Sequence, residues 1–115
     1  MKKENRLLKN QDFKSVLDFK KCVSRETAAF YHKNNDLQHC RVGVCVSSKI
    51  GNSVVRHRIK RQVNSMLDKY VPVDVGIDIV VIVRKKYTAN TYNDNSIIIE
   101  GCIKEILKRR NKNEK

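Results

Sequence analysis

The sequence predicts an α/β sandwich, in which helices pack on one small sheet. Two segments rich in β-branched residues, CRVGVCVS at 40–47 and IDIVVIVRK at 77–85, predict strands. Between them, residues 53–70 carry apolar side chains at helical spacing. A strand, a helix and a second strand in succession, with further elements on either side, favour this layered architecture. The 115 residues suffice for one domain, 1–115, with a modest core.

The segment QDFKSVLDFK, residues 11–20, predicts the first helix. Its apolar residues Phe13, Val16 and Leu17 fall on one face at helical spacing. Asn10 precedes them and is a suitable N-cap, because its side chain can accept a hydrogen bond from the first turn.

The next segment, CVSRETAAFYHK at 22–33, predicts extended backbone with Tyr31 near its end. NND at 34–36 then predicts a turn. In the strand at 40–47, valines alternate with glycine and cysteine, so we expect at least one of its faces to be covered.

Residues 53–70 predict the central helix, which begins after Gly51 and Asn52 and for which Ser53 is a suitable N-cap. At about 100° per residue, six apolar side chains fall within roughly a third of the circumference: Val55, Ile59, Val63, Met66, Leu67 and Tyr70. Much of the remainder is basic: Arg56, His57, Arg58, Lys60 and Arg61. Cations four residues apart repel each other on a helix, so this crowding is destabilising unless an anionic partner neutralises the charge.

The strand at 77–85 is β-branched on both faces, which predicts burial on both sides. TANTYNDN at 88–95 predicts a polar loop, and the last helix is expected to span Ser96 to Arg109. We expect the two ends of the chain, 1–5 and 110–115, to be flexible.

The charge of the chain is strongly unbalanced. Lys and Arg number 25 against 12 Asp and Glu, a formal net charge of +13. From Leu37 to Leu67 there is no acidic residue, yet six cations lie in this interval: Arg41, Lys49, Arg56, Arg58, Lys60 and Arg61. A solvated surface would normally mix the two signs. The pattern therefore points to an anionic partner, either nucleic acid or a membrane surface.

Several classes of protein are disfavoured. No apolar segment typical of a secretory signal follows residues 1–4, and the longest apolar run, 79–83, is too short to span a membrane. The chain has four cysteines: Cys22, Cys40, Cys45 and Cys102. Because none of them forms a C-x-x-C pair, we expect reduced thiols in the cytoplasm rather than disulfides or a zinc site.

Catalytic motifs are lacking as well. The glycines form no phosphate-binding loop, and Asp74 and Asp78 flank the start of a strand, which favours turn chemistry over a catalytic pair. His32 and His39 lie near a loop, where a surface role is favoured. We therefore expect no catalytic or metal-ligating residue, and any reaction would take its chemistry from a partner.

The basic helix has three interpretations. On a membrane its apolar stripe would insert in lipid, but here that stripe is needed as core between two strands. In a DNA major groove it would need a preceding short helix and tight turn. Folded RNA fits best, because Arg and Lys side chains on a rigid helix suit its phosphates and Gly51-Asn52 lets backbone approach at the helix N-terminus.

RVGVCVSSKIGNSVVRHRIKR, residues 41–61, resembles the signature of the bacterial ribonuclease P protein subunit. In that family a strand precedes K-[IV]-G-N-A-V-x-R-N-R-x-K-R, the RNR motif. The matching positions are Arg41, Val42, Gly43, Val46, Ser47, Lys49, Ile50, Gly51, Asn52, Val54, Arg56, Arg58, Lys60 and Arg61. NRLLKNQDFKSVL at 5–17 and DIVVIVRK at 78–85 resemble the family's opening and its last core strand, so the resemblance covers residues 5–108.

The sequence departs from the family pattern at five positions. His57 replaces an asparagine, although it can still donate a hydrogen bond, and Ser53 replaces an alanine. Ser48 and Asn64 stand where the family often has Lys and Arg, so we expect weaker RNA affinity. Leu17 stands where an aromatic is frequent, which would reduce a stacking contact to apolar packing.

The resemblance implies an α+β fold: a small sheet with three helices and a ribosomal-protein-like β–α–β unit with a left-handed crossover, against the usual right-handed rule. It also implies a protein cofactor for a catalytic RNA that removes the 5′ leader of precursor tRNA. That RNA would hold the catalytic Mg²⁺ ions and perform the hydrolysis. The expected partners are ribonuclease P RNA and precursor tRNA, without a membrane or an obligate protein partner.

The same resemblance assigns two sets of site residues. Those expected to contact the catalytic RNA are Lys49, Gly51, Asn52, Arg56, His57, Arg58, Lys60 and Arg61. The single-stranded leader is expected between the first helix and the sheet, at Phe13, Leu17 and Tyr31. Aromatic side chains there can stack on bases with little sequence preference. Core packing explains Phe13 and Leu17 equally well.

Three rival functions stay open at this point. A ribosomal or RNA-chaperone protein would bind many RNAs without promoting cleavage or separating precursor from mature tRNA. A self-sufficient nuclease is disfavoured by the lack of a carboxylate cluster. A DNA-binding regulator would prefer duplex DNA to structured RNA at matched salt.

Overall fold

The structure is a computed structural model, and it describes residues 2–113 of the chain. Its helices are α1 (Asn10–Asp18), α2 (Ser53–Tyr70) and α3 (Tyr92–Asn113), and its strands are β1 (Cys22–Ser24), β2 (Ala28–Asn34), β3 (Arg41–Val46) and β4 (Ile77–Val83). Two short 3₁₀ helices, η1 (Lys3–Asn5) and η2 (Lys85–Ala89), complete the described elements.

The four strands form one mixed sheet in the order β1-β2-β4-β3. β1 pairs with β2 and β2 with β4 in antiparallel fashion, whereas β3 and β4 are parallel. Because β3 and β4 are parallel neighbours, α2 is the crossover between them. Three helices on a small mixed sheet confirm the predicted α+β class, and the left hand of the crossover stays a prediction from the resemblance.

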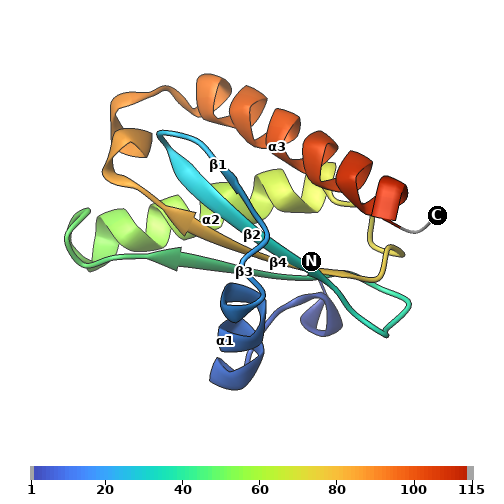
Figure 1. The fold of residues 1–115 in the computed structure, drawn as a ribbon. Helices are drawn as coiled ribbons and strands as arrows, with labels where there is room; N and C mark the ends of the chain where they lie inside the picture. Colours follow the sequence, from blue (N-terminus) through green and yellow to red (C-terminus); the bar gives the residue numbers. More distant parts are fainter. Residues whose placement is uncertain (1, 114–115) are drawn as a thin grey trace.

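The helices divide between the two faces of the sheet. In Figure 1, α2 and α3 lie on one side of the sheet and α1 lies on the other. β4 runs through the middle, and its residues are buried except for the half-buried Ile82. This confirms the prediction that the strand is covered on both faces.

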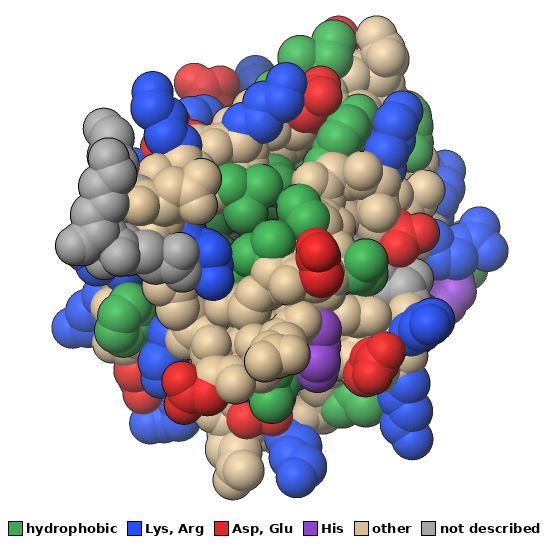
Figure 2. Space-filling model, turned by 90° about the vertical axis from the view of Figure 1, so that its right-hand side faces the viewer, with side chains coloured by type: hydrophobic (Ala, Val, Ile, Leu, Met, Phe, Trp, Pro, Cys, Tyr) green, Lys and Arg blue, Asp and Glu red, His purple; other side chains and the backbone are tan. Residues whose placement is uncertain are grey.

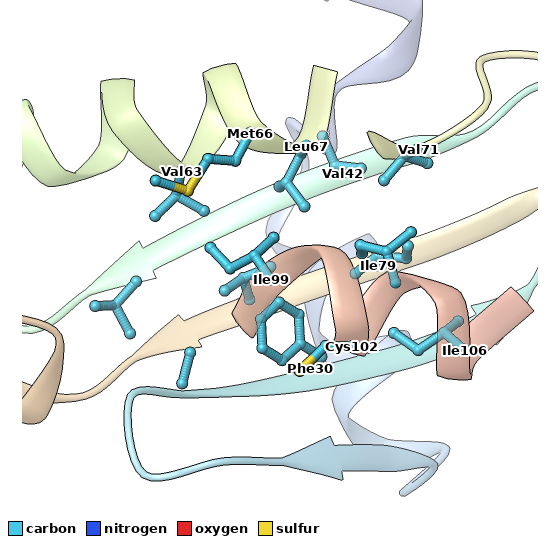
Figure 3. Close-up of a cluster of buried hydrophobic side chains, with 14 of the residues drawn as sticks. Phe30, Val42, Val63, Met66, Leu67, Val71, Ile79, Ile99, Cys102 and Ile106 are labelled. Atoms are coloured by element: carbon cyan, nitrogen blue, oxygen red, sulfur yellow. The ribbon is translucent and has the colours of Figure 1, made fainter. Parts of the chain in front are cut away.

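The main hydrophobic core fills the space between the sheet and helices α2 and α3. Figure 3 shows side chains from the sheet, α2 and α3 meeting there, including Phe30 of β2, Ile79 of β4, Leu67 of α2 and Ile106 of α3, each of them fully buried. A smaller cluster lies on the α1 face, where Leu7, Val16 and Val80 are buried. The two clusters together fix the sheet between its helices.

The N-terminal segment covers part of the free edge of β3. Arg6 pairs with Val42 in an isolated parallel bridge, and the Leu7 N–H donates to the Val42 carbonyl at 2.9 Å. Asn5 is buried and donates from Nδ2 to the carbonyl of Cys40 at 2.8 Å. Such pairing protects an edge strand from association with another chain.

Two predicted helix caps differ from the structure. Asn52, and not Ser53, caps α2: its Oδ1 accepts the backbone N–H of Val55 at 3.0 Å, and asparagine is among the strongest N-caps. Asn10 lies inside α1, whose N-cap position is Lys9 without a side-chain cap bond. The predicted span of α2, 53–70, is confirmed.

Two predicted segment boundaries are also wrong. Residues 22–33 are not one extended segment but a hairpin, in which the Arg25 N–H donates to the Ala28 carbonyl across the turn at 2.9 Å. The predicted loop at 88–95 is already helical from Tyr92, because Thr91 Oγ1 accepts the Asp94 N–H at 3.1 Å and starts α3 there.

The expected flexibility of the two ends stays a prediction. Within residues 1–5, Lys3–Asn5 forms η1, and within 110–115, helix α3 continues to Asn113. Residues 1, 114 and 115 lie outside the described part of the chain.

Candidate nucleic-acid interface

The N-terminal half of α2 presents its cations to solvent. His57, Arg58, Lys60 and Arg61 are exposed, and Arg56 is half-buried at the edge of the core. The apolar stripe of the same helix is buried against the sheet: Ile59, Val63, Met66 and Leu67. The helix is therefore anchored by one side while its basic side chains remain available to a partner.

The loop that leads into α2 is tightly built. The Ile50 N–H donates to the Ser47 carbonyl at 3.0 Å, and Ser47 Oγ accepts the Lys49 N–H at 3.1 Å. At Gly51 a Cβ would come within 2.9 Å of a Val55 methyl group, so glycine lets this loop lie close to the first helical turn. Lys49 and Asn52 are exposed beside it.

The first turn of α2 contains no acidic residue. A helix N-terminus carries partial positive charge from its free N–H groups and usually attracts acidic side chains. Here that charge adds to the charges of Lys49 and Arg56 rather than being offset. The N-terminus of α2 is therefore electropositive and suited to an anion such as a phosphate.

In the described part of the chain, the cations in the N-terminal half of α2 form no ion pair with a carboxylate. Within residues 2–113, the ion pairs involve other basic residues, such as Arg25 with Glu105 at 3.1 Å, and none involves Lys49, Arg56, Arg58, Lys60 or Arg61. Figure 2 shows that on the end of the molecule that lies at the right of Figure 1, acidic side chains are interspersed among the basic ones. What distinguishes the N-terminal half of α2 is thus that, among the described residues, its cations take part in none of these ion pairs.

The predicted RNA-contacting residues do not form one flat surface. Lys60, His57 and Arg61 line an open depression of about 570 Å³. Arg6 contributes to it from the N-terminal segment, and Asp68 from further along α2. Arg58 lies two residues before Lys60, roughly 160° around the helix. It shares its side of α2 with Gln62, whose Oε1 accepts the Tyr87 hydroxyl at 3.0 Å.

The three predicted leader-contacting residues meet on the α1 face of the sheet. Phe13, Leu17 and Tyr31 are half-buried and pack against the smaller hydrophobic cluster around Val80. Cys45 and Ile82 join them there as half-buried neighbours. We call these five side chains, Phe13, Leu17, Tyr31, Cys45 and Ile82, the open apolar surface. It is neither a closed core nor a fully exposed patch.

Gly43 of β3 positions Phe13 on this surface. A Cβ at Gly43 would lie 2.5 Å from two atoms of the Phe13 ring, so any larger residue would displace the ring. The glycine thus brings the aromatic side chain directly onto the strand backbone. Glycine inside a strand is a signal for such close approach, and it identifies Gly43 as a site residue that the sequence analysis missed.

A charged network holds α1 across the strands. Arg41 donates from Nε and Nη2 to the two oxygens of Asp78 at 2.9 and 2.6 Å, and from Nη1 to Asp12 of α1 at 3.3 Å. Asn35 Nδ2 donates to Asp78 Oδ1 at 2.7 Å. The hydrogen bond to Asp78 raises the pKa of Arg41 above its ordinary value. Because Asp12 precedes Phe13, this network also helps to orient the open apolar surface.

The basic helix and the open apolar surface are neighbours at the N-terminal segment. Arg6 lines the depression beside Lys60, and the next residue, Leu7, belongs to the buried cluster against which the open apolar surface packs. Burial raises the pKa of the Cys45 thiol, and the charge of Lys60 opposes that shift. Cys45, Ile82 and Arg6 belong to the combined site, yet they carry no sequence signal, since strand pairing alone brings them there.

Two further classes of site find no support in the described residues. Within 2–113, no three His, Cys, Asp or Glu side chains come together in a way that could hold a metal ion. Among the helices described, none has the length and apolar character needed to cross a membrane.

Comparisons with known proteins agree on one family. Residues 1–109 match the family model described as Ribonuclease P. The ribonuclease P protein component of Mycoplasma capricolum is 32% identical over 109 residues, covering 92% of this chain and 99% of the relative. That of Bacillus mycoides is 38% identical over 96 residues, covering 82% and 84%. A solved structure of a Staphylococcus aureus RNase P protein mutant superimposes with a TM-score of 0.76 at 29% identity, covering 95% of this chain and 90% of that one. The chain therefore belongs to the ribonuclease P protein family.

Proposed function

We propose that this protein binds the catalytic RNA of ribonuclease P through α2 and the 5′ leader of precursor tRNA through the open apolar surface. In this way it would promote Mg²⁺-dependent removal of the leader. The observation that carries the proposal is the junction of two unlike surfaces. Within residues 2–113, the cations in the N-terminal half of α2 form no ion pair, and at Arg6 and Leu7 they adjoin an aromatic and apolar surface that the fold leaves half covered.

The basic residues would act on RNA phosphates. Arg58, Lys60, Arg61 and the loop at Lys49–Asn52 supply charge, while the helix N-terminus supplies backbone N–H groups. If the five cations of this region meet phosphates, namely Lys49, Arg56, Arg58, Lys60 and Arg61, log K should fall against log salt with a slope of roughly −4 to −5. The crowding of like charges is then relieved by the RNA.

The open apolar surface would take unpaired bases of the leader. Tyr31 and Phe13 offer aromatic side chains for stacking, and Leu17 offers apolar contact. Base–aromatic stacking tolerates every base, because each has a π-face. Such a surface suits leaders of varied sequence, while the cations at its edge hold the backbone.

The chemistry of hydrolysis would come from the RNA subunit and its bound Mg²⁺. The described residues bring no set of metal-ligating side chains together, so no step of the proposal runs through a metal bound by this chain. The role of the protein is to bind and orient. We place this assembly in the cytoplasm, where precursor tRNA is available, with the RNA as its only obligate partner.

The test is cleavage of a precursor tRNA by bacterial ribonuclease P RNA at low Mg²⁺, with and without this protein. We expect rapid cleavage only when both are present. The protein without the RNA should not cleave, and cleavage by the protein with Mg²⁺ alone would support a self-sufficient nuclease instead. Tight RNA binding without stimulation of cleavage would favour a ribosomal or chaperone role and reject the proposal.

A further inference from the structure

A second hollow lies beyond the C-terminal end of α1. Its volume is about 250 Å³, and it is lined by Phe19, Lys21, His32, Lys33, Asn34 and Arg110. We call it the Phe19 pocket. Phe19 and Lys21 flank Lys20, whose positive φ of 61° turns the chain sharply after the helix. Arg110 comes from the last turns of α3, so the pocket joins elements from both faces of the sheet.

The Phe19 pocket is cationic. Lys21, Lys33 and Arg110 line it, and none of the described residues in its wall is acidic. Nearby positive charges also act on His32: its pKa is lowered by burial and by the charges of Arg109 and Lys21. A concave site with one sign of charge concentrates ligands of the opposite sign. The expected ligand is therefore anionic.

His32 lies in the wall of this pocket. The residue is only 8% exposed, and its Nε2 has no hydrogen-bond partner within the described part of the chain, which is uncommon for a buried polar nitrogen. Because burial lowers the pKa of this imidazole and so favours its neutral form, the positive charge of the pocket comes from the lysines and the arginine.

Phe19 adds an aromatic face to the cations. Its side chain is 50% exposed, which is unusual for a residue of this size. Lys33 Nζ lies 5.6 Å from the centroid of the ring and donates to Ser15 Oγ at 2.8 Å, so the ammonium is held beside the aromatic face. An exposed ring next to a fixed cation matches a nucleotide, in which a flat base is tethered to a phosphate.

The Phe19 pocket continues the open apolar surface. Tyr31 and Lys33 are two residues apart on β2, so they lie on the same face of the sheet, roughly 7 Å apart along the strand. Lys33 also contacts α1 at Ser15 and Phe19, which ties the pocket to the end of that helix. A single strand that leaves Tyr31 and Leu17 would therefore meet Phe19 and the lysines next.

We propose that the Phe19 pocket is a further RNA subsite, which takes one nucleotide of the leader upstream of the segment on Tyr31. The base stacks on Phe19, and the phosphate lies among Lys21, Lys33 and Arg110. The inference rests on the proposed function, because it extends the path of the leader. An acidic peptide is a poorer match, since it would use the cations and leave the exposed ring without a partner.

The test measures the affinity of the assembled ribonucleoprotein for precursor tRNAs whose leaders are shortened one nucleotide at a time. In the native protein, affinity should rise at the leader length that first reaches the Phe19 pocket. Phe19→Ala and Lys21→Ala should each lose about tenfold for leaders of that length or longer, and nothing for shorter ones. Both residues are exposed, so the fold should tolerate these changes.

Two matched controls remove an exposed ring and an exposed cation elsewhere. Tyr92→Ala removes an aromatic residue that is 48% exposed, and Lys104→Ala removes a cation whose side chain is 75% exposed, both on α3 and outside the pocket. They should bind every leader as the native protein does. Losses with Phe19→Ala or Lys21→Ala that are equal at all leader lengths, or no loss at all, would overturn the subsite. If the native protein shows no preference for any leader, the proposed function itself fails.

Discussion

The two faces of the sheet differ in how completely they are covered. On the face covered by α2 and α3, the side chains of β2 and β4 are buried; Phe30 and Ile79 are fully so. Under α1, Val80 is buried, but Tyr31 of β2 and Ile82 of β4 stay half-buried. A short helix of 9 residues cannot cover a face that two longer helices cover on the other side. The closed face supplies stability, and the open face has apolar surface left for a partner.

The largest expected effect is a difference in folding stability between substitutions on the two faces of one strand. Ile79 and Ile82 of β4 point to opposite sides, the first into the main core and the second onto the open apolar surface. Ile79→Ala should lower the free energy of unfolding by about 2–5 kcal/mol, because it leaves a cavity in a closed core. Ile82→Ala should cost about half as much, since its side chain is already partly in water. Urea denaturation of both variants measures the difference, and equal losses would break the distinction.

The next effect concerns binding rather than folding. Tyr31→Ala should weaken binding of the ribonucleoprotein to precursor tRNA by about 1–3 kcal/mol, the value of one lost stacking contact. Binding of leaderless tRNA should stay unchanged. Affinities for the two RNAs, measured side by side, give the result. An equal loss for both would indicate a folding defect instead of a leader contact.

A smaller change is expected in the salt dependence of RNA binding. Arg61→Ala and Arg58→Ala should each flatten the slope of log K against log salt by about one unit, because one phosphate contact is removed. Arg25 provides the matched control, since it is already paired with Glu105. Arg25→Ala should leave the slope as it is. If the α2 variants keep the native slope, the arginines do not meet phosphates.

The smallest expected effect is the pH dependence of folding stability that His32 causes on the closed face. The pKa of His32 is lowered from its ordinary value of 6.5, so the unfolded chain takes up a proton at this residue before the folded protein does. Stability from the neutral ring is therefore complete above pH 6.5 and is lost as the pH falls through that value, by at most about 1.4 kcal/mol per pH unit. Denaturation between pH 7.5 and 5.5 should show a steeper decline in the native protein than in His32→Asn. Parallel declines would contradict this assignment.

The sequence analysis succeeded where a pattern is local. The span of α2 followed from the apolar stripe that later proved to be buried, and β4 from its continuous β-branched run. The hairpin at Arg25–Thr27 was missed because it contains neither glycine nor proline. The start of α3 was missed because polar residues typical of loops cap this helix and bond to η2, as Asn95 does to the Tyr87 carbonyl at 3.0 Å.

The residues of the candidate site also divide into those that a local sequence pattern reveals and those that only the tertiary structure brings together. The cations of α2 are neighbours in sequence, so their charge was visible without a structure. Arg6, Cys45 and Ile82 join the site only through the pairing of β3 with β4 and with the N-terminal segment. Arg58 and Lys60 point to different sides of α2 because each residue turns the helix by about 100°. The same rule that located the apolar stripe predicts this separation from the sequence.

The central claim is that the open apolar surface contacts the leader while α2 contacts the catalytic RNA. The most direct measurement is photo-crosslinking of the assembled ribonucleoprotein, with 4-thiouridine placed either in the leader or in the ribonuclease P RNA, followed by identification of the linked peptide. We predict links from the leader to the peptides that hold Phe13 and Tyr31, and links from the catalytic RNA to Lys49–Arg61. Leader links to the solvent side of α3, or catalytic-RNA links that avoid α2, would contradict the account.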